Sequence, residues 1–164
     1  LMELLTNAFE DKLDETVYQS FIKELQNAKT LIYCLDNCGE IVVDMIAIKT
    51  IIKQFPHLKV IAMVRGGDVL NDVTIADVQQ VGLDQICEIM INTYPMAGID
   101  LNHIDPNTYE LLQHADVILA KGQGNFESLC GCGLNIYYLL LCKCSLFAER
   151  FAMPLYQGVF HKER

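Results

Sequence analysis

The stretch LIYCLDNCGE, residues 31–40, is an apolar run of strand length that ends at an acid, an amide and a glycine. The sequence that follows, EIVVDMIAIKTIIKQF at residues 40–55, has helical spacing, with Ile41, Asp44 and Ile48 on one side. A buried strand followed at once by a helix is a βα unit. The stretch therefore predicts an α/β fold and places polar side chains at the end of a buried strand.

The same alternation continues to the C-terminal region. Further apolar runs of strand length lie at 60–64, 88–92, 116–120 and 135–143, and helical segments lie at about 73–81, after Asp105-Pro106 and at 145–152. Strands that are apolar on both faces and separated by helices indicate a mostly parallel sheet with helices on each side. We expect an N-terminal helical segment at 1–29, the remnant of a longer helical region, and one α/β domain at 30–164.

Composition excludes several classes of protein. A chain of 164 residues with 52% hydrophobic content fits one globular core. Its longest apolar runs, such as IYYLLLC at 136–142, are shorter than the ~18 residues expected of a membrane span. The net charge of −9 argues against nucleic acid or an anionic membrane surface as a partner. Seven cysteines, several inside apolar runs, favour a reducing, cytoplasmic location.

Polar groups and glycines follow three of the predicted strands, as DNCGE, RGGDVLND and KGQGNFE. Ligands of parallel α/β sheets bind beyond the carboxyl ends of the strands. If these strands are neighbours, Asp36, Asn37 and Asp72 offer the oxygen ligands that Mg²⁺ or Mn²⁺ prefers. Arg65 and Lys121 would then neutralise a phosphate bound to the metal. The alternative is that these residues only cap helices and form turns, which Asp, Asn and Gly commonly do.

The segments DNCGEIVVD, RGGDVLNDVTIADV, KGQGNFESL and LLLCKC resemble the signature blocks of the metal-dependent damage-control phosphatases, the family of domain of unknown function 89. The resemblance covers nearly all of residues 28–155. It implies a three-layer α/β/α Rossmann-like fold and hydrolysis of phosphate monoesters, such as sugar phosphates or phosphopantetheine derivatives, with Mg²⁺, Mn²⁺, Co²⁺ or Ni²⁺ as cofactor. The expected partner is a small phosphorylated metabolite, and the oligomeric state is left open.

The resemblance also implies roles for individual residues. The metal ligands fall on Asp36, Asn37 and Asp72, and catalysis is expected to depend on Asp36, Asp72 and Lys121. The substrate contacts fall on Glu40, Arg65, Gly66, Asn71, Lys121, Gly122, Asn125 and Glu127. The chain departs from the family pattern at Cys38, where a small Ala is more common. The helical segment that normally precedes this domain, with a substrate-directed Asn, is absent or cut off before Leu1.

Rival interpretations remain. A haloacid-dehalogenase type of phosphatase needs a second Asp two residues after Asp36, and Cys38 stands there. An S-adenosylmethionine-dependent carboxyl methyltransferase needs a glycine-rich turn after the first strand and an acid after the second, where this chain has a single glycine and Arg65. A non-catalytic metabolite-binding domain is the third alternative. Glu40 and Glu127 are both candidates for the acid that assists hydrolysis.

Two cysteine pairs, Cys130-Gly-Cys132 and Cys142-Lys-Cys144, raise the question of a second metal site. Their one-residue gaps differ from the two-to-four-residue gaps that are common in structural zinc sites. Free cysteine is also frequently a small buried hydrophobe. The four histidines, His57, His103, His114 and His161, show no ligand spacing, and none is expected to be a catalyst.

Overall fold

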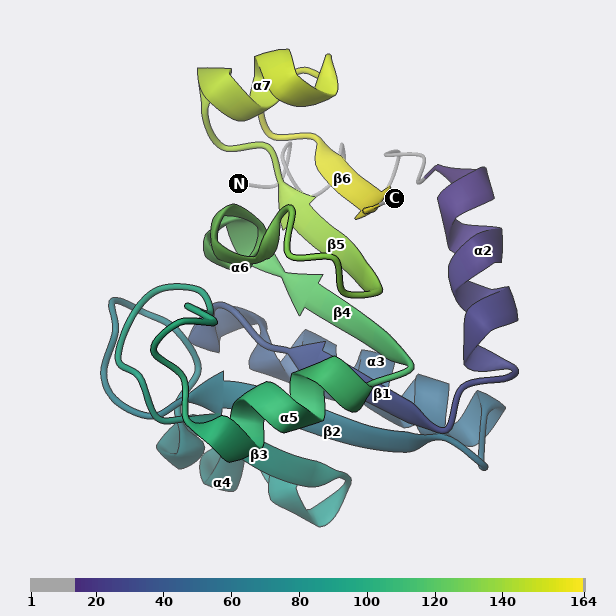
Figure 1. The fold of residues 1–164 in the computed structure, drawn as a ribbon, viewed down its shortest axis with the longest axis vertical. Coiled ribbons are helices and arrows are strands. Elements are labelled where there is room, and N and C mark those ends of the chain that lie inside the picture. Colours follow the sequence, from purple (N-terminus) through teal and green to yellow (C-terminus); the bar gives the residue numbers. More distant parts are fainter. Residues whose placement is uncertain (1–13, 164) are drawn as a thin grey trace.

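The computed structural model describes residues 14–163, and the core of the fold is a six-stranded sheet (Figure 1). The strand order is β3-β2-β1-β4-β5-β6. The strands are β1 (Thr30–Cys34), β2 (Lys59–Arg65), β3 (Glu88–Asn92), β4 (Val117–Lys121), β5 (Ile136–Leu141) and β6 (Gly158–Lys162). Strands β1 to β5 are parallel, and β6 pairs antiparallel to β5. The mostly parallel sheet predicted from the sequence is confirmed.

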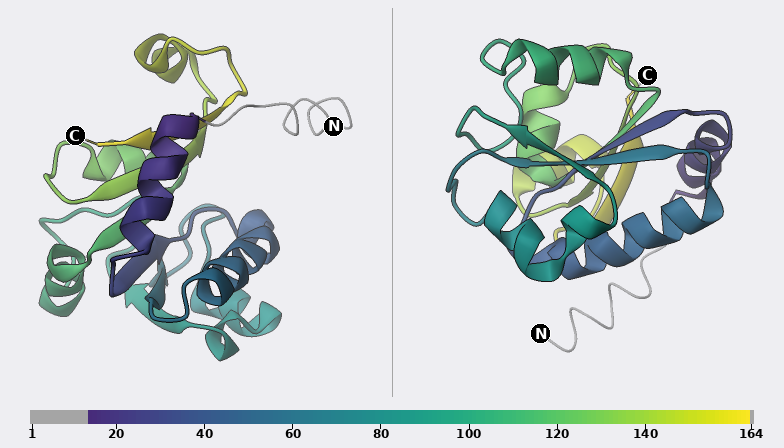
Figure 2. Two further views of the ribbon diagram at one scale, coloured as in Figure 1. Left: turned by 90° about the vertical axis from the view of Figure 1, so that its right-hand side faces the viewer. Right: turned by 90° about the horizontal axis from the view of Figure 1, so that it is seen from below.

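Helices cover both faces of this sheet, as the two turned views show (Figure 2). They are α2 (Glu15–Leu25), α3 (Ile41–Gln54), α4 (Ile75–Val81), α5 (Pro106–His114), α6 (Gly122–Leu129) and α7 (Ser145–Phe151), with short 3-10 helices η1 (Cys38–Glu40) and η2 (Leu83–Gln85). Side chains of α2, α3 and α4 pack into one core and those of α5, α6 and α7 into another. The three-layer α/β/α arrangement is therefore confirmed.

The two cores follow from the alternation of side chains along the strands. In β2, Val60, Ala62 and Val64 face the core of α3, whereas Met63 faces the core of α6. In β4, Leu119 faces α3 and Ala120 faces α6. The sheet is thus apolar on both faces, which is why its strands are continuous hydrophobic runs in the sequence.

The expected elements agree with the structure to within a few residues, with two additions. Helix α6 was not predicted, because its first residues, Gly-Gln-Gly, have no apolar periodicity. Strand β6 was missed because its sequence, GVFHK, is short and lies at the edge of the sheet. Helix α2 falls in the predicted N-terminal helical segment, and the remainder of that prediction, residues 1–13, lies outside the described residues.

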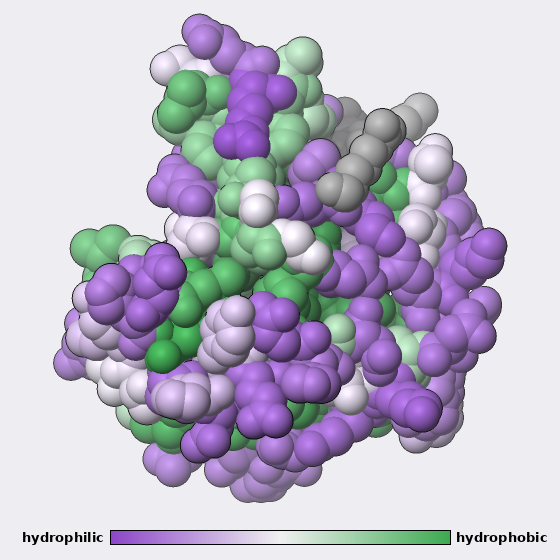
Figure 3. All heavy atoms as spheres, viewed as in Figure 1, coloured by the Kyte–Doolittle hydropathy of each residue, from purple (hydrophilic) through white to green (hydrophobic). Residues whose placement is uncertain are grey.

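One side of the molecule shows the distribution of polar and apolar side chains on the surface. Hydrophilic side chains dominate the face shown in Figure 3, and hydrophobic surface is confined to smaller areas between them. In residues 14–163, no helix is both long and apolar enough to cross a bilayer.

The strand order reverses between β1 and β4. From β1 the chain moves outward through β2 to β3, and it then returns to β4 on the other side of β1. The loops after β1 and β4 consequently leave in opposite directions and open a crevice at their carboxyl ends, where ligands of such sheets bind. Asp36 and Gly122 follow these two strands.

Candidate functional site

The segments that follow β1 and β2 are joined by a short antiparallel bridge between Asn37 and Asp72. The Cys38 N–H donates to the carbonyl oxygen of Asn71 at 2.8 Å, and the Val73 N–H donates to that of Asp36 at 2.8 Å. These bonds hold the two segments side by side. The predicted meeting of the first two β-α junctions therefore occurs at the crevice beside β1.

The Asp36 carboxylate lies against the backbone of Gly122, at the start of α6. A Cβ atom built on Gly122 would be 2.0 Å from Oδ2 of Asp36, so a side chain cannot be placed there. Gly122 also has a φ of +80°, which favours glycine. Burial raises the pKa of Asp36, and the nearby charges of Asp72 and Glu40 raise it further. The charges of Arg65 and Lys143 act in the opposite direction, so the Asp36 carboxyl lies among both acidic and basic groups.

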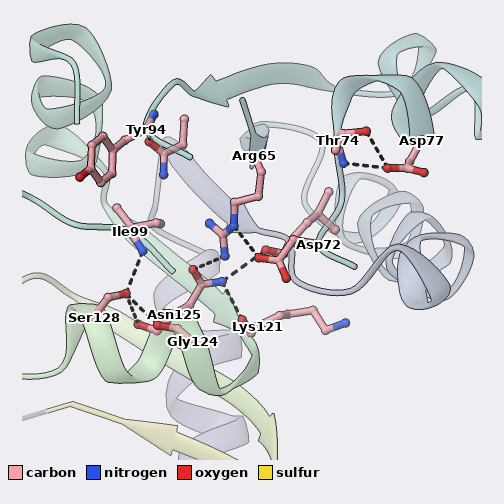
Figure 4. Close-up of polar contacts among 12 residues, drawn as sticks. Arg65, Asp72, Thr74, Asp77, Tyr94, Ile99, Lys121, Gly124, Asn125 and Ser128 are labelled. Atoms are coloured by element: carbon pink, nitrogen blue, oxygen red, sulfur yellow. Dashed lines mark hydrogen bonds and ion pairs between the residues drawn. The ribbon is translucent and has the colours of Figure 1, made fainter. Parts of the chain in front are cut away.

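The capping alternative holds for Asn37 and fails for Asp72. The Oδ1 atom of Asn37 accepts the Gly39 N–H at 2.8 Å and caps helix η1. Helix α4, in contrast, is capped by Thr74, which forms a capping box with Asp77 (Figure 4). The Asp72 carboxylate is left for a different contact, and its Oδ2 accepts the Arg65 Nε–H at 2.7 Å.

The donor set at this place consists of two carboxylates and one amide. In the described part of the chain, no three His, Cys, Asp or Glu side chains converge on a common metal position. Mg²⁺ and similar hard cations are commonly bound by one or two carboxylates, and the remaining coordination positions are filled by water and phosphate oxygens. Asp36, Asp72 and Asn37 therefore fit such a cation by their chemistry, although Asn37 would have to share its oxygen with Gly39.

Arg65 is a buried connector between the two sides of the crevice. Its side chain is 1% exposed. Besides Asp72, it binds Asn125, which accepts the Arg65 Nη2–H at 2.9 Å (Figure 4). The Asn125 amide in turn donates to the carbonyl oxygens of Lys121 at 2.7 Å and Leu35 at 3.3 Å. Arg65 thus fixes Asp72 relative to β1, β4 and α6.

Lys121 lies on the opposite face of the sheet from Arg65. Ala120 faces α6, so the next residue faces α3, whereas Arg65 follows Val64 and faces α6. Figure 4 shows the Lys121 side chain pointing away from Asn125 and Arg65. Strand alternation therefore directs the two cations to different sides of the sheet, and their joint role at one phosphate stays a prediction.

The Lys121 ammonium binds two carboxylates of the α3 region. It donates to Glu40 and lies 2.9 Å from Oδ1 of Asp44. Burial acts to lower the pKa of Lys121, but the two carboxylates raise it overall, so the amine remains protonated. Asp44 also accepts the Tyr33 hydroxyl at 2.7 Å. The result is a chain of polar contacts that crosses from β1 to β4 through α3.

Asp44 is a site residue that sequence analysis did not select. It is buried, and burial raises its pKa while the Lys121 ammonium and the Tyr33 hydroxyl act in the opposite direction. The signal was present, because Asp44 stands in the apolar stripe of the helix that it shares with Ile41 and Ile48. A charged residue on the buried side of a helix needs a buried partner.

Lys143 is a second residue that the analysis did not select. It lines a hollow of about 350 Å³ together with Asp36, Glu40, Lys121 and Gly122. It follows β5 and is exposed, and its charge acts to lower the pKa of Asp36. Ligands of parallel α/β sheets bind beyond the carboxyl ends of the strands, and Lys143 follows the end of β5. Lys143 could therefore have been predicted from the sequence in the same way as the residues after β1, β2 and β4.

Three further residues that were predicted to contact the substrate do not line this hollow. The Gly66 N–H donates to the Asn92 carbonyl at 2.7 Å, and a Cβ at Gly66 would lie 2.6 Å from that same oxygen. Gly66 is thus required for packing between β2 and β3. Asn71 is exposed and contributes its carbonyl to the bridge. Glu127 is exposed and lies about 200° around α6 from the buried Asn125.

The chain is similar to proteins of one family in the comparisons with known proteins. The family model described as the damage-control phosphatase ARMT1-like domain matches residues 2–158. A damage-control phosphatase of Pyrococcus horikoshii is 30% identical over 155 residues, which are 94% of this chain and 54% of the relative. A damage-control phosphatase of Archaeoglobus fulgidus is 37% identical over 130 residues, which are 78% of this chain and 44% of the relative. The chain thus spans about half the length of these relatives.

A solved structure agrees with this result. The crystal structure of a DUF89 family protein from Pyrococcus horikoshii superposes with a TM-score of 0.85 at 28% identity, covering 94% of this chain and 53% of that one. The architecture is thus shared over almost the whole of the present chain. With a family model that covers nearly every residue, the conclusion is direct: this chain belongs to the damage-control phosphatase ARMT1-like family.

Proposed function

We propose that this domain hydrolyses small phosphate monoesters in a reaction that requires a divalent metal ion. The observation that carries the proposal is the backbone bridge between Asn37 and Asp72, which holds the segments that carry Asp36 and Asp72 side by side near the point where the strand order reverses. The names of the relatives, damage-control phosphatases, support the reaction class. The proposed substrate is a damaged or surplus phosphorylated metabolite.

Asp36, Asp72 and Asn37 are the proposed ligands of Mg²⁺, Mn²⁺, Co²⁺ or Ni²⁺. When bound, such an ion supplies Lewis-acid chemistry at phosphorus and activates water for attack. Arg65 holds Asp72 in place through the bond to its Oδ2. The Gly122 backbone fits beneath the Asp36 carboxylate, and this contact defines where that ligand stands.

Lysines are the proposed contacts of the substrate phosphate. Lys143 is exposed at the hollow, and its charge is available for phosphate oxygens. Lys121 already contacts Glu40 and both carboxylate oxygens of Asp44, so it would act on a phosphate through its charge or by exchanging one of these partners. Glu40 is 44% exposed at the same hollow, which makes its carboxyl group a candidate for proton transfer during hydrolysis.

The test is a phosphometabolite panel with the full-length protein, including sugar phosphates and phosphopantetheine derivatives, in which Mg²⁺, Mn²⁺, Co²⁺ and Ni²⁺ are added separately. Metal binding is measured in parallel by calorimetry with Mn²⁺. Asp36→Asn and Asp72→Asn are expected to lose metal binding and to lower phosphate release by roughly 100-fold or more, since the charge that develops at phosphorus would no longer be stabilised.

Asp68→Asn is the matched control, because Asp68 is exposed in the loop that precedes Asp72. It should leave metal affinity and hydrolysis unchanged. Full activity of Asp36→Asn or Asp72→Asn would refute the assignment. Binding of S-adenosylmethionine in place of phosphate release would support a methyltransferase, and metal binding without turnover of any ester would support a binding domain.

A further inference from the structure

A second chemically distinctive feature lies at the other end of α6 from the candidate site. Cys130 follows the last turn of this helix, and Gly131 and Cys132 continue it as a turn. Both cysteines are partly exposed free thiols. They line an open polar hollow of about 510 Å³ with Asp100 and Tyr109. Solvent and small solutes can therefore approach the pair.

The two thiols have different surroundings. The Arg150 Nη2–H donates to Sγ of Cys130 at 3.0 Å. The same guanidinium lies 4.7 Å from the centre of the Phe126 ring, a contact that keeps the charge beside the sulfur. A cation in contact with a thiol stabilises the thiolate, which is the nucleophilic form. This contact with Arg150 is the reason to assign the first, attacking step to Cys130.

Cys132 has the complementary environment. Burial raises the pKa of its thiol, and the charges of Glu163 and Cys130 raise it further. The two cysteines are separated by one residue and line the same hollow. A thiol that stays protonated until its neighbour has reacted suits the second, resolving step of an exchange.

The backbone of the turn allows the two sulfurs to meet. Consecutive Cα atoms are about 3.8 Å apart, so residues i and i+2 are at most about 7.6 Å apart, and a bent backbone such as this turn brings them nearer to the ~4.4–6.8 Å that a disulfide requires. Gly131 has a φ of +87° and Gly133 a φ of +80°, and no atom lies within 4 Å of a Cβ built at either. Both glycines therefore face open space.

One contact fixes the position of the turn on the sheet. The Glu163 carboxylate accepts the Gly131 N–H and, through its other oxygen, the Tyr138 hydroxyl at 2.9 Å. The turn is thus tied to β5 and the end of the chain beyond β6. The pair remains at the edge of the hollow, where it can meet a reactant.

We propose that Cys130 and Cys132 form a reversible dithiol–disulfide site that exchanges with low-molecular-weight disulfides of the glutathione class. The Cys130 thiolate attacks one sulfur of the small disulfide, forming a mixed disulfide and releasing one small thiolate. Cys132 then loses its proton to solvent and attacks the Cys130 sulfur, which releases the second small thiolate. The protein loses two electrons and two protons, and the small disulfide is reduced to two thiols.

The experiment uses the fully reduced chain and oxidised glutathione, with acid quenching at timed intervals and peptide mapping by mass spectrometry. The wild-type peptide that contains both cysteines should lose two hydrogens. Cys132→Ser should accumulate a stable glutathione adduct on Cys130, because the resolving thiol is missing. Arg150→Leu should slow the first step roughly 3- to 10-fold, because it removes the cationic N–H donor that lies 3.0 Å from Sγ of Cys130.

Cys144→Ser is the matched control, because Cys144 is an exposed cysteine of the other pair. It should leave the reaction at Cys130 unchanged. The proposal is overturned if the wild-type peptide keeps both thiols while Cys144 is modified, or if Arg150→Leu reacts as fast as wild type. The wild-type mapping does not depend on any substitution, so it decides the matter even where a variant fails to fold.

Discussion

The contact between Asp44 and Lys121 gives the sharpest prediction on stability. Asp44→Asn keeps the shape of the side chain and an acceptor for the Tyr33 hydroxyl, but it removes the charge that lies 2.9 Å from the Lys121 ammonium. Removing one partner of a buried ion pair costs about 3–5 kcal/mol. Glu40 still neutralises Lys121 in the variant, and we therefore expect a loss of about 2 kcal/mol.

Urea unfolding followed by circular dichroism measures this loss, and a chain of this length should also melt about 4–8 °C lower. Glu88→Gln is the control, because it removes the acid of a surface pair, Lys59–Glu88, whose side chains are 57% and 52% exposed. That change should cost only about 0–1 kcal/mol. A double-mutant cycle with Lys121→Met should give a coupling energy of about 1.5–3 kcal/mol.

The pH dependence of the free energy of unfolding provides an independent check that the pair of Asp44 and Lys121 is stabilising. The carboxylates raise the pKa of Lys121 above its unfolded value, so the pair contributes fully below pH 10.5 and is lost as pH rises through the folded pKa. The difference between wild type and Asp44→Asn should therefore be constant from pH 7 to about 10 and shrink above that range. The reasoning fails if Asp44→Asn unfolds like Glu88→Gln, or if the coupling energy with Lys121→Met is within error of zero.

Three further predictions follow from other contacts. Gly122→Ala should abolish Mn²⁺ binding measured by calorimetry, because its Cβ would meet Oδ2 of Asp36 at 2.0 Å, whereas Gly131→Ala, with a similar positive φ in open space, should keep it. Arg65→Lys should lower the free energy of unfolding by about 3 kcal/mol in urea, since a lysine cannot bind Asp72 and Asn125 with the same fork; a loss below about 1 kcal/mol would contradict the connector role. Burial acts to raise the pKa of Glu24, but Lys162, Asn135 and Tyr137 lower it overall, so its contribution is present above its unfolded pKa of 4.5 and lost as pH falls through the folded value. Acid titration of unfolding should therefore show a smaller loss of stability below pH 4.5 in Glu24→Gln than in wild type, and identical curves would rule out this role for Glu24.

Much of the fold could be derived from the chain by local patterns alone. Apolar runs of strand length, separated by segments with helical spacing, predicted five of the six strands and the layer arrangement. Asp105 and Pro106 predicted the start of α5, where Asp105 accepts the N–H groups of Asn107 and Thr108. Such features are local, because capping and periodicity depend on residues only a few positions apart. Helix α6 and strand β6 lacked these signals.

The sequence also named most of the residues at the crevice, because the ends of parallel strands are marked by acids, amides, lysines and glycines. It determined that Asp36, Asn37 and Asp72 were candidate ligands. It also offered two interpretations of each, as a cap or as a ligand, and no local pattern could separate them. The structure argues against the capping interpretation of Asp72, because Thr74 and Asp77 cap α4 instead, and the role of Asp72 as a ligand stays a prediction.

Only the tertiary structure decided which charged side chains lie on each side of the sheet. The strand order placed β1 between β2 and β4, and strand alternation then sent Arg65 toward α6 and Lys121 toward α3. Asp44 acquired its role in the same way, since a residue 77 positions before Lys121 meets it only after the sheet has assembled. The sequence by itself determines the local conformation and which reactive side chains are present at each strand end, because both depend on residues that are near neighbours in the chain. Which of these side chains meet depends on strand order and register, and these are set by long-range packing.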